Sequence, residues 1–332
     1  MNEKIRIGIL GYGNLGRGVE LALRQNHDME LVAFFTRRDP AALKTLTPSV
    51  PVYHVDDVLK YQNDIDVLIL CGGSATDLPV QTPKYVQYFN VVDSFDTHAK
   101  IPEHFANVDA AARASGKVGM ISTGWDPGIF SLQRAIAGAF IPGARAYGFY
   151  GLGPKGGLSM GHSDALRTIP GVKDARQFTH AIPEAIDKIR NGENPVFEPG
   201  DMHTRECFVV LEEGADKEAI TKTILEMPGY FAPYKTTVNF ISQEELDAKY
   251  KGFPHDGIVL AAGVTGNGNT ALSEYRCQWG SNPEATANVL VAHARAVVRL
   301  AREGKSGAFT ILDIPASYFS LMTKEELLAH CM

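Results

Sequence analysis

A glycine pattern directly after a short apolar run constrains the fold of this chain most. The run Ile5–Leu10 (IRIGIL) is typical of a strand buried on both faces of a parallel sheet. Gly11–Gly16 (GYGNLG) follows as GxGxxG and leads into an amphipathic segment. In such a turn the first glycine allows a tight bend, the second lets the backbone approach a pyrophosphate, and the third lets helix and strand pack closely. The pattern predicts a dinucleotide-binding fold, the alternative being a glycine-rich turn of another α/β protein.

The end of the second strand indicates which dinucleotide is bound. Strand Met29–Phe35 begins about 20 residues after the start of the glycine pattern, as a dinucleotide-binding sequence requires. Enzymes that use NAD usually carry Asp or Glu at the end of this strand, where this chain has Thr36, Arg37 and Arg38. A hydroxyl and two guanidinium groups suit a 2′-phosphate, so NADP is favoured over NAD. The alternative is a solvated pair of loop arginines.

The first part of the chain alternates strands and helices. Further buried strands are predicted at Asp66–Cys71, Asn90–Phe95 and Lys117–Ser122, with helices from about Thr82 and at Pro102–Ser115. This alternation is typical of a parallel, doubly wound sheet of the Rossmann type. We therefore expect an α/β protein with a dinucleotide-binding domain over residues 1–124.

Beyond residue 140 the pattern changes to strands that resemble an antiparallel sheet. The predicted strands are Ala144–Tyr150, Glu206–Leu211, Thr236–Ile241, Gly257–Val264 and Ala271–Trp279. The predicted helices are Asp164–Ile169, Pro183–Arg190, Ala215–Glu226, Glu244–Tyr250 and a long final helix, Pro283–Glu303. We expect residues 125–279 to form a mixed α/β substrate-binding and dimerisation domain with an open, largely antiparallel sheet. The segment from about 280 to 332, with a last strand at Ala308–Asp313, is expected to pack back on the first domain.

Composition excludes several classes of function. The 332 residues carry 32 Lys and Arg against 38 Asp and Glu, a net charge of −6 without a long basic cluster, so a nucleic-acid partner is not expected. No apolar run approaches the roughly 20 residues that span a bilayer, and the start of the chain lacks the pattern of a signal peptide. We expect a cytoplasmic protein without a membrane partner.

Cysteine and histidine spacings predict no metal site. The 4 cysteines are far apart, without the CxxC spacing of metal ligands, and are interpreted as reduced, mostly buried thiols. The histidines show no HExxH spacing either. His162, Ser163 and Asp164 are the residue types of a hydrolase triad, but sequence neighbours cannot form that relay and no GxSxG is present, so Ser163 is interpreted as a helix cap.

Two carboxylates follow predicted parallel strands. Asp96 follows the fourth strand and Asp126 the loop after the fifth. Ligands of open parallel sheets bind beyond the carboxyl ends of the strands, so both are candidates to face a nicotinamide. The alternatives are that Asp96 caps a turn and that Asp126, before Pro127, starts a helix.

Several longer motifs, in this order, resemble the meso-diaminopimelate dehydrogenase family over nearly the whole chain. They are GYGNLGRGVE from Gly11, the pair Arg37 and Arg38, GSATDLP from Gly73, STGWDPGIFS from Ser122, GHSDALRTIPGV from Gly161, RECFVV from Arg205, FPHDG from Phe253 and SNP from Ser281. The segments STGWDPG and GHSDALR are far more specific than GxGxxG. The loop Gly151–Leu158 is longer than the family's, which leaves open whether Phe149 or Tyr150 faces substrate.

The resemblance implies an NADP-dependent dehydrogenase of lysine biosynthesis that reversibly deaminates the D-centre of meso-2,6-diaminopimelate to L-2-amino-6-oxopimelate and ammonia. The implied residues around the reacting carbon are Asp96, Trp125 and Asp126, with Ser159, Met160 and Gly161 near its carboxylate. The implied residues at the distal end are Thr179, Arg205, His255 and Asn282. A substrate with an ammonium and a carboxylate at each end needs acidic groups and an arginine, which agrees with this division.

These residues also have ordinary structural interpretations. Arg205 could form a surface ion pair, His255 could be a loop histidine, Thr179 a packing residue and Asn282 the N-cap before Pro283. The predicted cofactor contacts are Gly11, Tyr12, Gly13, Asn14, Leu15, Thr36, Arg37, Arg38, Cys71, Gly72, Gly73, Ser74, Ala75, Thr76, Ser94, Phe95, Asp96, Pro127 and Gly128.

The implied reaction needs a base near the amine, because an ammonium cannot assist hydride departure. Asp126 or Asp96 could serve, or both could stay ionised while water carries the proton. The family implies a homodimer, for which the apolar helix near Ile129–Phe140 is a hint. The alternatives are another NADP-dependent amino-acid dehydrogenase, similar to homoserine dehydrogenase, and a catalytically silent NADP sensor.

Overall fold

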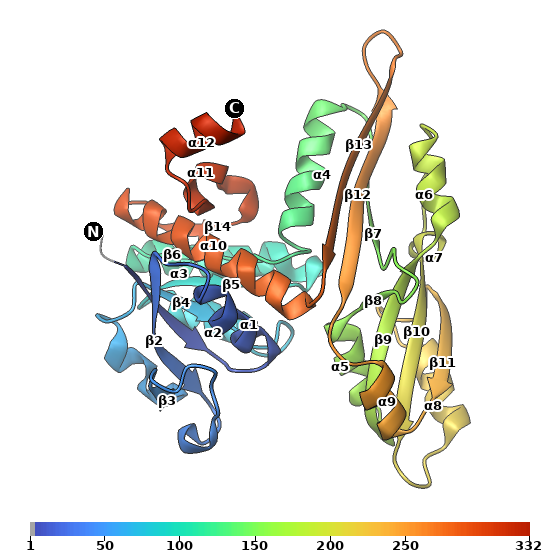
Figure 1. The fold of residues 1–332 in the computed structure, drawn as a ribbon, viewed down its shortest axis with the longest axis horizontal. Helices are drawn as coiled ribbons and strands as arrows, with labels where there is room; N and C mark the ends of the chain where they lie inside the picture. The colour runs from blue at the N-terminus through green and yellow to red at the C-terminus, as the bar shows by residue number, and fades with distance from the viewer. Residues whose placement is uncertain (1–3) are drawn as a thin grey trace. The chain divides into compact units, whose positions relative to one another are not determined.

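The computed structural model describes residues 4–332. Seven strands, six from the first 120 residues and one from near the end of the chain, form one parallel sheet (Figure 1). Its strand order is β14-β6-β5-β4-β1-β2-β3. The strands are β1 (Ile5–Leu10), β2 (Met29–Thr36), β3 (Val52–His54), β4 (Val67–Leu70), β5 (Asn90–Asp93), β6 (Val118–Met120) and β14 (Gly307–Phe309). Because β14 pairs with β6 in parallel, the chain end returns to the first sheet, as predicted.

Helices cover both faces of this sheet. They are α1 (Asn14–Leu23), α2 (Leu78–Tyr85), α3 (Ile101–Ser115) and α10 (Asn282–Arg302); two further helices, α11 (Ala316–Phe319) and α12 (Lys324–Cys331), follow α10 in the chain and have no buried residue. Alternate strand residues point to opposite faces, so Ile7 and Ile69 pack with α1 and α10, whereas Leu68 and Leu70 pack with α2 and α3. This arrangement confirms the predicted doubly wound sheet.

Several predicted boundaries in this sheet were wrong. Strands β4, β5 and β6 are shorter than predicted, and β3 was missed. Helix α2 begins at Leu78 and not near Thr82. The predicted last strand Ala308–Asp313 is a strand only to Phe309, because the Thr310 hydroxyl accepts the Leu312 N–H and starts a 3-10 turn.

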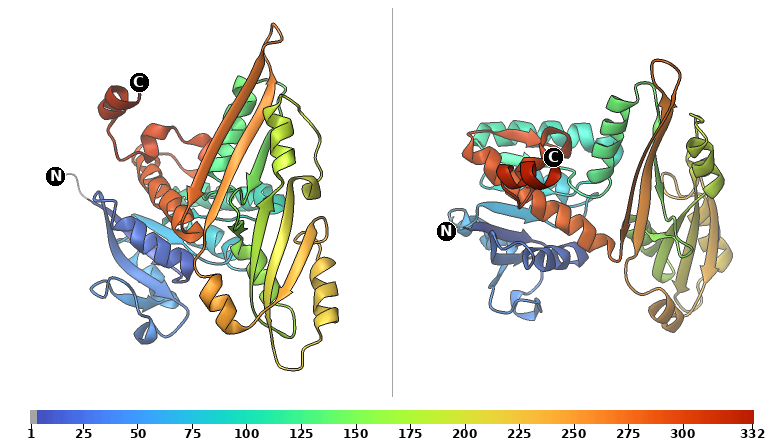
Figure 2. Two further views of the ribbon diagram at one scale, coloured as in Figure 1. Left: turned by 45° about the vertical axis from the view of Figure 1, so that its right-hand side comes forward. Right: turned by 45° about the horizontal axis from the view of Figure 1, so that its top comes forward.

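The middle of the chain contains two further sheets. One has the order β11-β10-β9-β8 and the other β13-β12-β7. Their strands are β7 (Ala146–Tyr150), β8 (Gly157–Leu158), β9 (Val172–Ala181), β10 (His203–Leu211), β11 (Lys235–Phe240), β12 (His255–Val264) and β13 (Thr270–Trp279). Figure 2 shows the antiparallel β12–β13 hairpin as a long twisted ribbon.

These sheets confirm the predicted α/β class and refine its second part. The strands divide between two sheets instead of one, and β10 pairs with β11 in parallel. Strands β8 and β9 were missed because polar and charged residues interrupt the apolar alternation of β9 (VKDARQFTHA).

Helices α5, α6, α8 and α9 pack on these sheets. The helices of this part are α4 (Ile129–Phe140), α5 (Met160–Arg167), α6 (Pro183–Arg190), α7 (Pro199–Met202), α8 (Lys217–Leu225) and α9 (Gln243–Lys249). Apolar residues of α5 and α8 pack on one face of the four-stranded sheet, and Leu246 of α9 packs on the other. Helix α6 packs on the β7–β12 pair.

The chain divides into two compact units. Unit 1 contains the described residues up to Leu132 together with Pro283–Met332, and unit 2 is Gln133–Asn282. The boundary therefore falls inside α4. Within residues 4–332, every helix is too short or too polar to cross a bilayer.

None of the four cysteines forms a disulfide, in agreement with their interpretation as reduced thiols. The prediction that most of them are buried was wrong, since Cys207 is buried, Cys71 and Cys277 are half-buried, and Cys331 is exposed on α12.

Candidate functional site

The turn between β1 and α1 has the backbone that a bound pyrophosphate requires. Gly11 has a φ of +94°, which favours glycine. A Cβ on Gly16 would lie 2.1 Å from the Gly11 carbonyl oxygen, so helix and strand meet only if this residue is glycine. A Cβ on Gly13 would have no described heavy atom within 4 Å, and no described side chain caps α1. The open backbone at Gly13 and the helix start fit an anion.

The loop after β2 presents the two predicted arginines. The Thr36 hydroxyl is buried and accepts the Arg38 N–H at 3.1 Å, while the Arg38 guanidinium donates to the Tyr12 carbonyl at 2.5 Å. Arg37 binds both carboxylate oxygens of Asp77, at 2.9 and 3.1 Å. The side chain of Arg37 is nevertheless 68% exposed. Both cations are therefore held near the glycine turn and stay accessible, which fits a 2′-phosphate.

The loop after β4 supplies small residues and one connection to Asp96. Asp77 accepts the Gly73 N–H at 2.9 Å. The Ser74 hydroxyl accepts the Asp96 N–H at 2.8 Å. Burial raises the pKa of the Cys71 thiol well above its usual range, so Cys71 is no nucleophile at neutral pH.

The two predicted carboxylates lie on different loops of unit 1. Asp96 is exposed, and Asp126 is half-buried and precedes a cis peptide bond to Pro127. Trp125 is 6% exposed, with its ring 4.8 Å from that of Phe130.

The remaining cofactor candidates of these loops differ in exposure. Phe95 is buried and stacks on His104, with ring centroids 4.2 Å apart, so it belongs to the core. Ser94 is half-buried, and Pro127 and Gly128 are buried. A Cβ on Gly128 would lie 1.7 Å from the Gly124 carbonyl oxygen, so the loop closes only with glycine there.

Unit 2 contains a buried arginine on β10. Arg205 is 9% exposed, its guanidinium lies 4.0 Å from the centre of the Tyr234 ring, and Nη1 donates to the Thr179 hydroxyl of β9. Within the described part of the chain, its Nε has no hydrogen-bond partner. Burial lowers the pKa of Arg205 from its usual value. The structure therefore excludes a surface ion pair and leaves this cation short of acceptors.

Three histidines near Arg205 are shifted toward the neutral form. Burial, followed by the charge of Arg205, lowers the pKa of His162 and of His203 to about 3. Burial also lowers the pKa of His255 to about 4. These rings are neutral at pH 7 and supply hydrogen bonds without further positive charge.

The structure separates Phe149 from Tyr150. Phe149 is fully buried in the core around α6. The Tyr150 ring stacks on His203 at 5.4 Å and meets the His255 ring edge-on at 6.2 Å. Its hydroxyl accepts a hydrogen bond from Arg134 at 2.9 Å. Phe149 also contacts His203, with ring centroids 5.7 Å apart, but only Tyr150 contacts the predicted residue His255.

Ser159, Met160 and Gly161 lie at the start of α5. Ser159 is the N-cap of this helix and accepts the His162 N–H. The interpretation of Ser163 as a cap was wrong: it lies inside α5, donates to the Ser159 carbonyl and accepts the Gln177 N–H at 2.9 Å. Met160 is half-buried and Gly161 is exposed.

Asn282 is the first residue of α10 and not the cap that precedes it. Its amide donates to the Leu158 carbonyl at 3.4 Å, and its backbone N–H to Phe253 at 2.7 Å. Asn282 thus joins β8 to the segment that directly precedes His255.

Two neighbours of Arg205 were missed from the sequence. His203 accepts the Tyr150 N–H at 3.0 Å, and Tyr234 stacks on the arginine. The two-residue period of a strand gave a signal for His203, because His203, Arg205 and Cys207 share one face of β10. Tyr234 had no signal, since it lies in the turn before β11.

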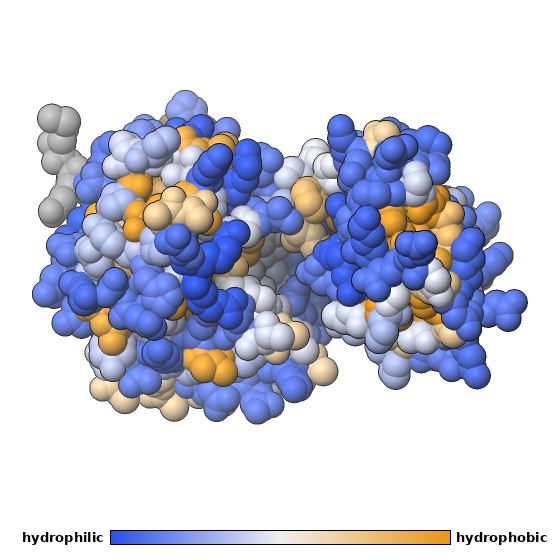
Figure 3. All heavy atoms as spheres, turned by 90° about the horizontal axis from the view of Figure 1, so that it is seen from below, coloured by the Kyte–Doolittle hydropathy of each residue, from blue (hydrophilic) through white to orange (hydrophobic). Residues whose placement is uncertain are grey.

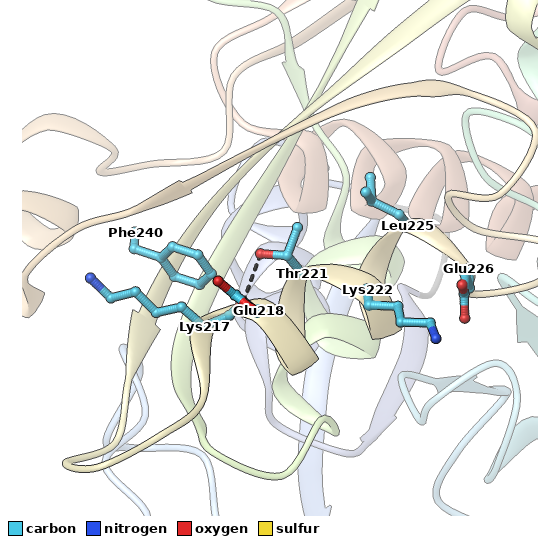
Figure 4. Close-up of a pocket in the computed structure, with 7 residues that line it drawn as sticks. All are labelled: Lys217, Glu218, Thr221, Lys222, Leu225, Glu226 and Phe240. Atoms are coloured by element: carbon cyan, nitrogen blue, oxygen red, sulfur yellow. Dashed lines mark hydrogen bonds between the residues drawn. The ribbon is translucent and has the colours of Figure 1, made fainter.

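One surface pocket lies away from the predicted site residues. A pocket of about 500 Å³ lies between α8 and β11, lined by Lys217, Glu218, Thr221, Lys222, Leu225, Glu226 and Phe240 (Figure 4). None of these is a predicted site residue. The face shown in Figure 3 is mainly hydrophilic, with smaller hydrophobic patches on each unit. Within residues 4–332, no cluster of His, Cys, Asp and Glu could hold a metal ion.

Comparisons with known proteins agree with one another. The family described as "Diaminopimelic acid dehydrogenase C-terminal domain" matches residues 124–281. The meso-diaminopimelate D-dehydrogenase of Lysinibacillus sphaericus is 54% identical over 97% of this chain and 98% of its own length. The structure of Corynebacterium glutamicum DAP dehydrogenase in complex with DAP has a TM-score of 0.92 and 43% identity, covering 99% of each chain. An engineered D-amino acid dehydrogenase bound to NADP⁺ has a TM-score of 0.90 and 42% identity, covering 99% of this chain and 100% of that one.

Proposed function

Because this chain belongs to the meso-diaminopimelate D-dehydrogenase family, we propose that it deaminates the D-centre of meso-2,6-diaminopimelate oxidatively, with NADP as its cofactor. When bound, NADP⁺ accepts the hydride of the D-centre carbon, which leaves an imine that water converts to L-2-amino-6-oxopimelate and ammonia. The reverse reaction fixes ammonia and would serve lysine biosynthesis. Buried Arg205, short of acceptors among neutral histidines, carries the proposal, because the distal carboxylate of this substrate would match it.

Unit 1 would hold the cofactor. The open backbone at Gly13 and the start of α1 would bind the pyrophosphate, and Thr36, Arg37 and Arg38 the 2′-phosphate. The small residues 71–76 and the loops at 94–96 and 127–128 would contact the rest of the cofactor. Phe95 is buried against His104, so it would support the loop at 94–96 from the core and would not contact the cofactor with its ring.

Asp96, Trp125 and Asp126 would contact the reacting end of the substrate. An ammonium must lose a proton before the nitrogen lone pair assists hydride departure, so a carboxylate near the amine would accept that proton or orient the water that does. Ser159, Met160 and Gly161 would lie near the carboxylate of this end.

Unit 2 would hold the distal amino-acid end. Arg205 would bind its carboxylate, with Thr179 holding the guanidinium in place. His255 and Asn282 would add hydrogen bonds, and Tyr150 would pack against the chain of the substrate. His203 would fix the orientation of Tyr150, whose backbone N–H it accepts.

We also propose a homodimer located in the cytoplasm. Phe140 at the end of the apolar helix α4 is 80% exposed, and β13 is an edge strand of its sheet. Both features would be protected by a second copy. Free cysteines are typical of a reducing compartment.

The first test is the absorbance of reduced cofactor when the purified protein meets NADP⁺ and meso-diaminopimelate. The LL and DD isomers, L-homoserine and NAD⁺ are parallel controls. Reduction is expected only with the meso isomer and NADP⁺. A protein that binds NADP but leaves every substrate unoxidised would contradict the proposal and support an NADP sensor.

A further inference from the structure

A buried carboxylate at the end of β5 accepts hydrogen bonds from several directions. Asp93 is fully buried. Its Oδ1 accepts the Phe95 N–H at 3.0 Å and the Ser122 N–H at 2.9 Å. Its Oδ2 accepts the Thr82 hydroxyl at 2.7 Å and lies 2.8 Å from His104 Nε2. A carboxylate has about four acceptor positions, so this side chain is saturated.

Two of these partners, Phe95 and Ser122, belong to the loops that carry the proposed reacting-end residues. Phe95 directly precedes Asp96, and Ser122 begins the loop that continues to Trp125 and Asp126. The backbone of Asp93 adds a third contact, since its carbonyl accepts the Thr123 N–H at 2.9 Å. One residue therefore binds both loops where they leave the sheet.

The second loop needs this support. Ser122 has a φ of +52°, a left-handed conformation that residues other than glycine rarely adopt. Such a conformation persists only where surrounding contacts enforce it, and the Ser122 N–H is bonded to Asp93. Thr82 of α2 and His104 of α3 in turn fix the carboxylate from the helix side of the sheet.

We propose that Asp93 is a positioning residue of the reaction, which fixes the loops of Asp96 and Asp126 so that both carboxylates are correctly placed at the reacting amine. The inference rests on the proposed function, which assigns Asp96 and Asp126 to that amine. Displacement of a catalytic group by about 1 Å can cost about 100-fold in rate. The residues proposed for the pyrophosphate, for the 2′-phosphate and for the distal substrate end lie outside these two loops, so a change at Asp93 should lower kcat more than it weakens the binding of NADP or substrate.

The same strand offers a matched control. Asn90, at the opposite end of β5, accepts the Val118 N–H of β6 at 3.0 Å and donates to the Asp66 carbonyl at 3.1 Å. Asn90→Ala thus removes a bond between the same two strands far from both loops. Comparing it with Asp93→Asn separates a general loss of stability from a loss of loop placement.

The experiment measures kcat, KM for meso-diaminopimelate and Kd for NADP⁺ in wild type, D93N and N90A. We expect D93N to lower kcat at least tenfold while KM and Kd change less than threefold, and N90A to keep kcat within twofold. A D93N kcat near wild type, or equal kcat losses in D93N and N90A, would overturn the inference. If D93N does not fold, T82V removes one bond to the carboxylate; we expect a several-fold lower kcat, and an unchanged kcat would overturn the inference.

Failure of the proposed function has a different signature. In that case the wild type itself would bind NADP⁺ without oxidising meso-diaminopimelate. Crystal structures of wild type and D93N would then decide the inference: shifted loops at 94–96 and 122–126 would support it, and unmoved loops would overturn it.

Discussion

The buried charges of units 1 and 2 differ in how completely the chain satisfies them with hydrogen bonds. In unit 1, both carboxylate oxygens of Asp93 are fully used by donors of the chain itself. In unit 2, Arg205 stacks on Tyr234 and donates to Thr179, but its Nε has no described partner. A saturated buried charge makes a scaffold rigid, whereas an unsaturated one costs stability until a ligand of opposite charge arrives. Asp93 therefore stabilises the structure of unit 1, whereas Arg205 is available to bind a ligand of opposite charge.

The largest effect is expected from removing a carboxylate at the reacting end. Asp126→Asn should lower kcat by about 10²–10⁴-fold, the range for loss of a general acid–base group. Kd for NADP⁺, measured by fluorescence titration, should change less than threefold. Equal losses in kcat and in cofactor binding would count against the assigned role.

Removing the unsaturated charge of unit 2 should affect substrate binding. Arg205→Met should raise KM for meso-diaminopimelate by about 10–100-fold, because a charge-assisted hydrogen bond contributes about 1.5–3 kcal/mol. Titration of NADP⁺ provides the control and should be unchanged. An unaltered KM would show that the distal carboxylate binds elsewhere.

The two charges should also differ in their effect on the ligand-free fold. Asp93→Asn should lower the free energy of unfolding by about 2 kcal/mol or more, since it disrupts a saturated buried network. Arg205→Met should leave it unchanged or raise it by about 1 kcal/mol, because Nε of the buried guanidinium has no described acceptor. Urea unfolding checks both values. Strong destabilisation by Arg205→Met would show that Arg205, like Asp93, stabilises the ligand-free fold.

Arg38 tests the cofactor preference of unit 1. Arg38→Met should weaken NADP⁺ binding about tenfold by removing one cation from the 2′-phosphate. Binding of NAD⁺, which lacks that phosphate, should stay within twofold. If both cofactors lose affinity equally, Arg38 acts only through its bond to the Tyr12 carbonyl.

The stability of unit 2 should also depend on pH. Burial lowers the pKa of His203 to about 3 and that of His255 to about 4, so the unfolded chain binds protons that the native chain rejects. The free energy of unfolding should therefore fall as the pH drops from about 6.5 toward 4, by up to about 1.4 kcal/mol per pH unit for each group. His203→Phe should reduce this slope in urea unfolding at pH 7 and pH 5. An unchanged slope would show that His203 is not the group that titrates.

Local sequence patterns determined unit 1 far better than unit 2. The bounds of β1 match the prediction, and Gly11, Gly13 and Gly16 have the three backbone environments that GxGxxG requires. Such signals lie within a few residues of the structure they specify. In unit 2, β9 was missed because polar and charged residues interrupt its apolar alternation, so that no local pattern marks it as a strand.

For the candidate site too, some properties were visible in the sequence and others appeared only in the structure. Residue types and motifs made Arg37, Arg38, Asp96, Asp126 and Arg205 candidates from the sequence alone, because their chemistry or motif is visible there. Only the tertiary structure showed that Arg205 is buried beside Tyr234, that Tyr150 contacts both His203 and His255, and that Asp93 joins two loops. Burial and hydrogen-bond saturation depend on which distant segments the fold brings together, so these properties were decided by packing rather than by local sequence.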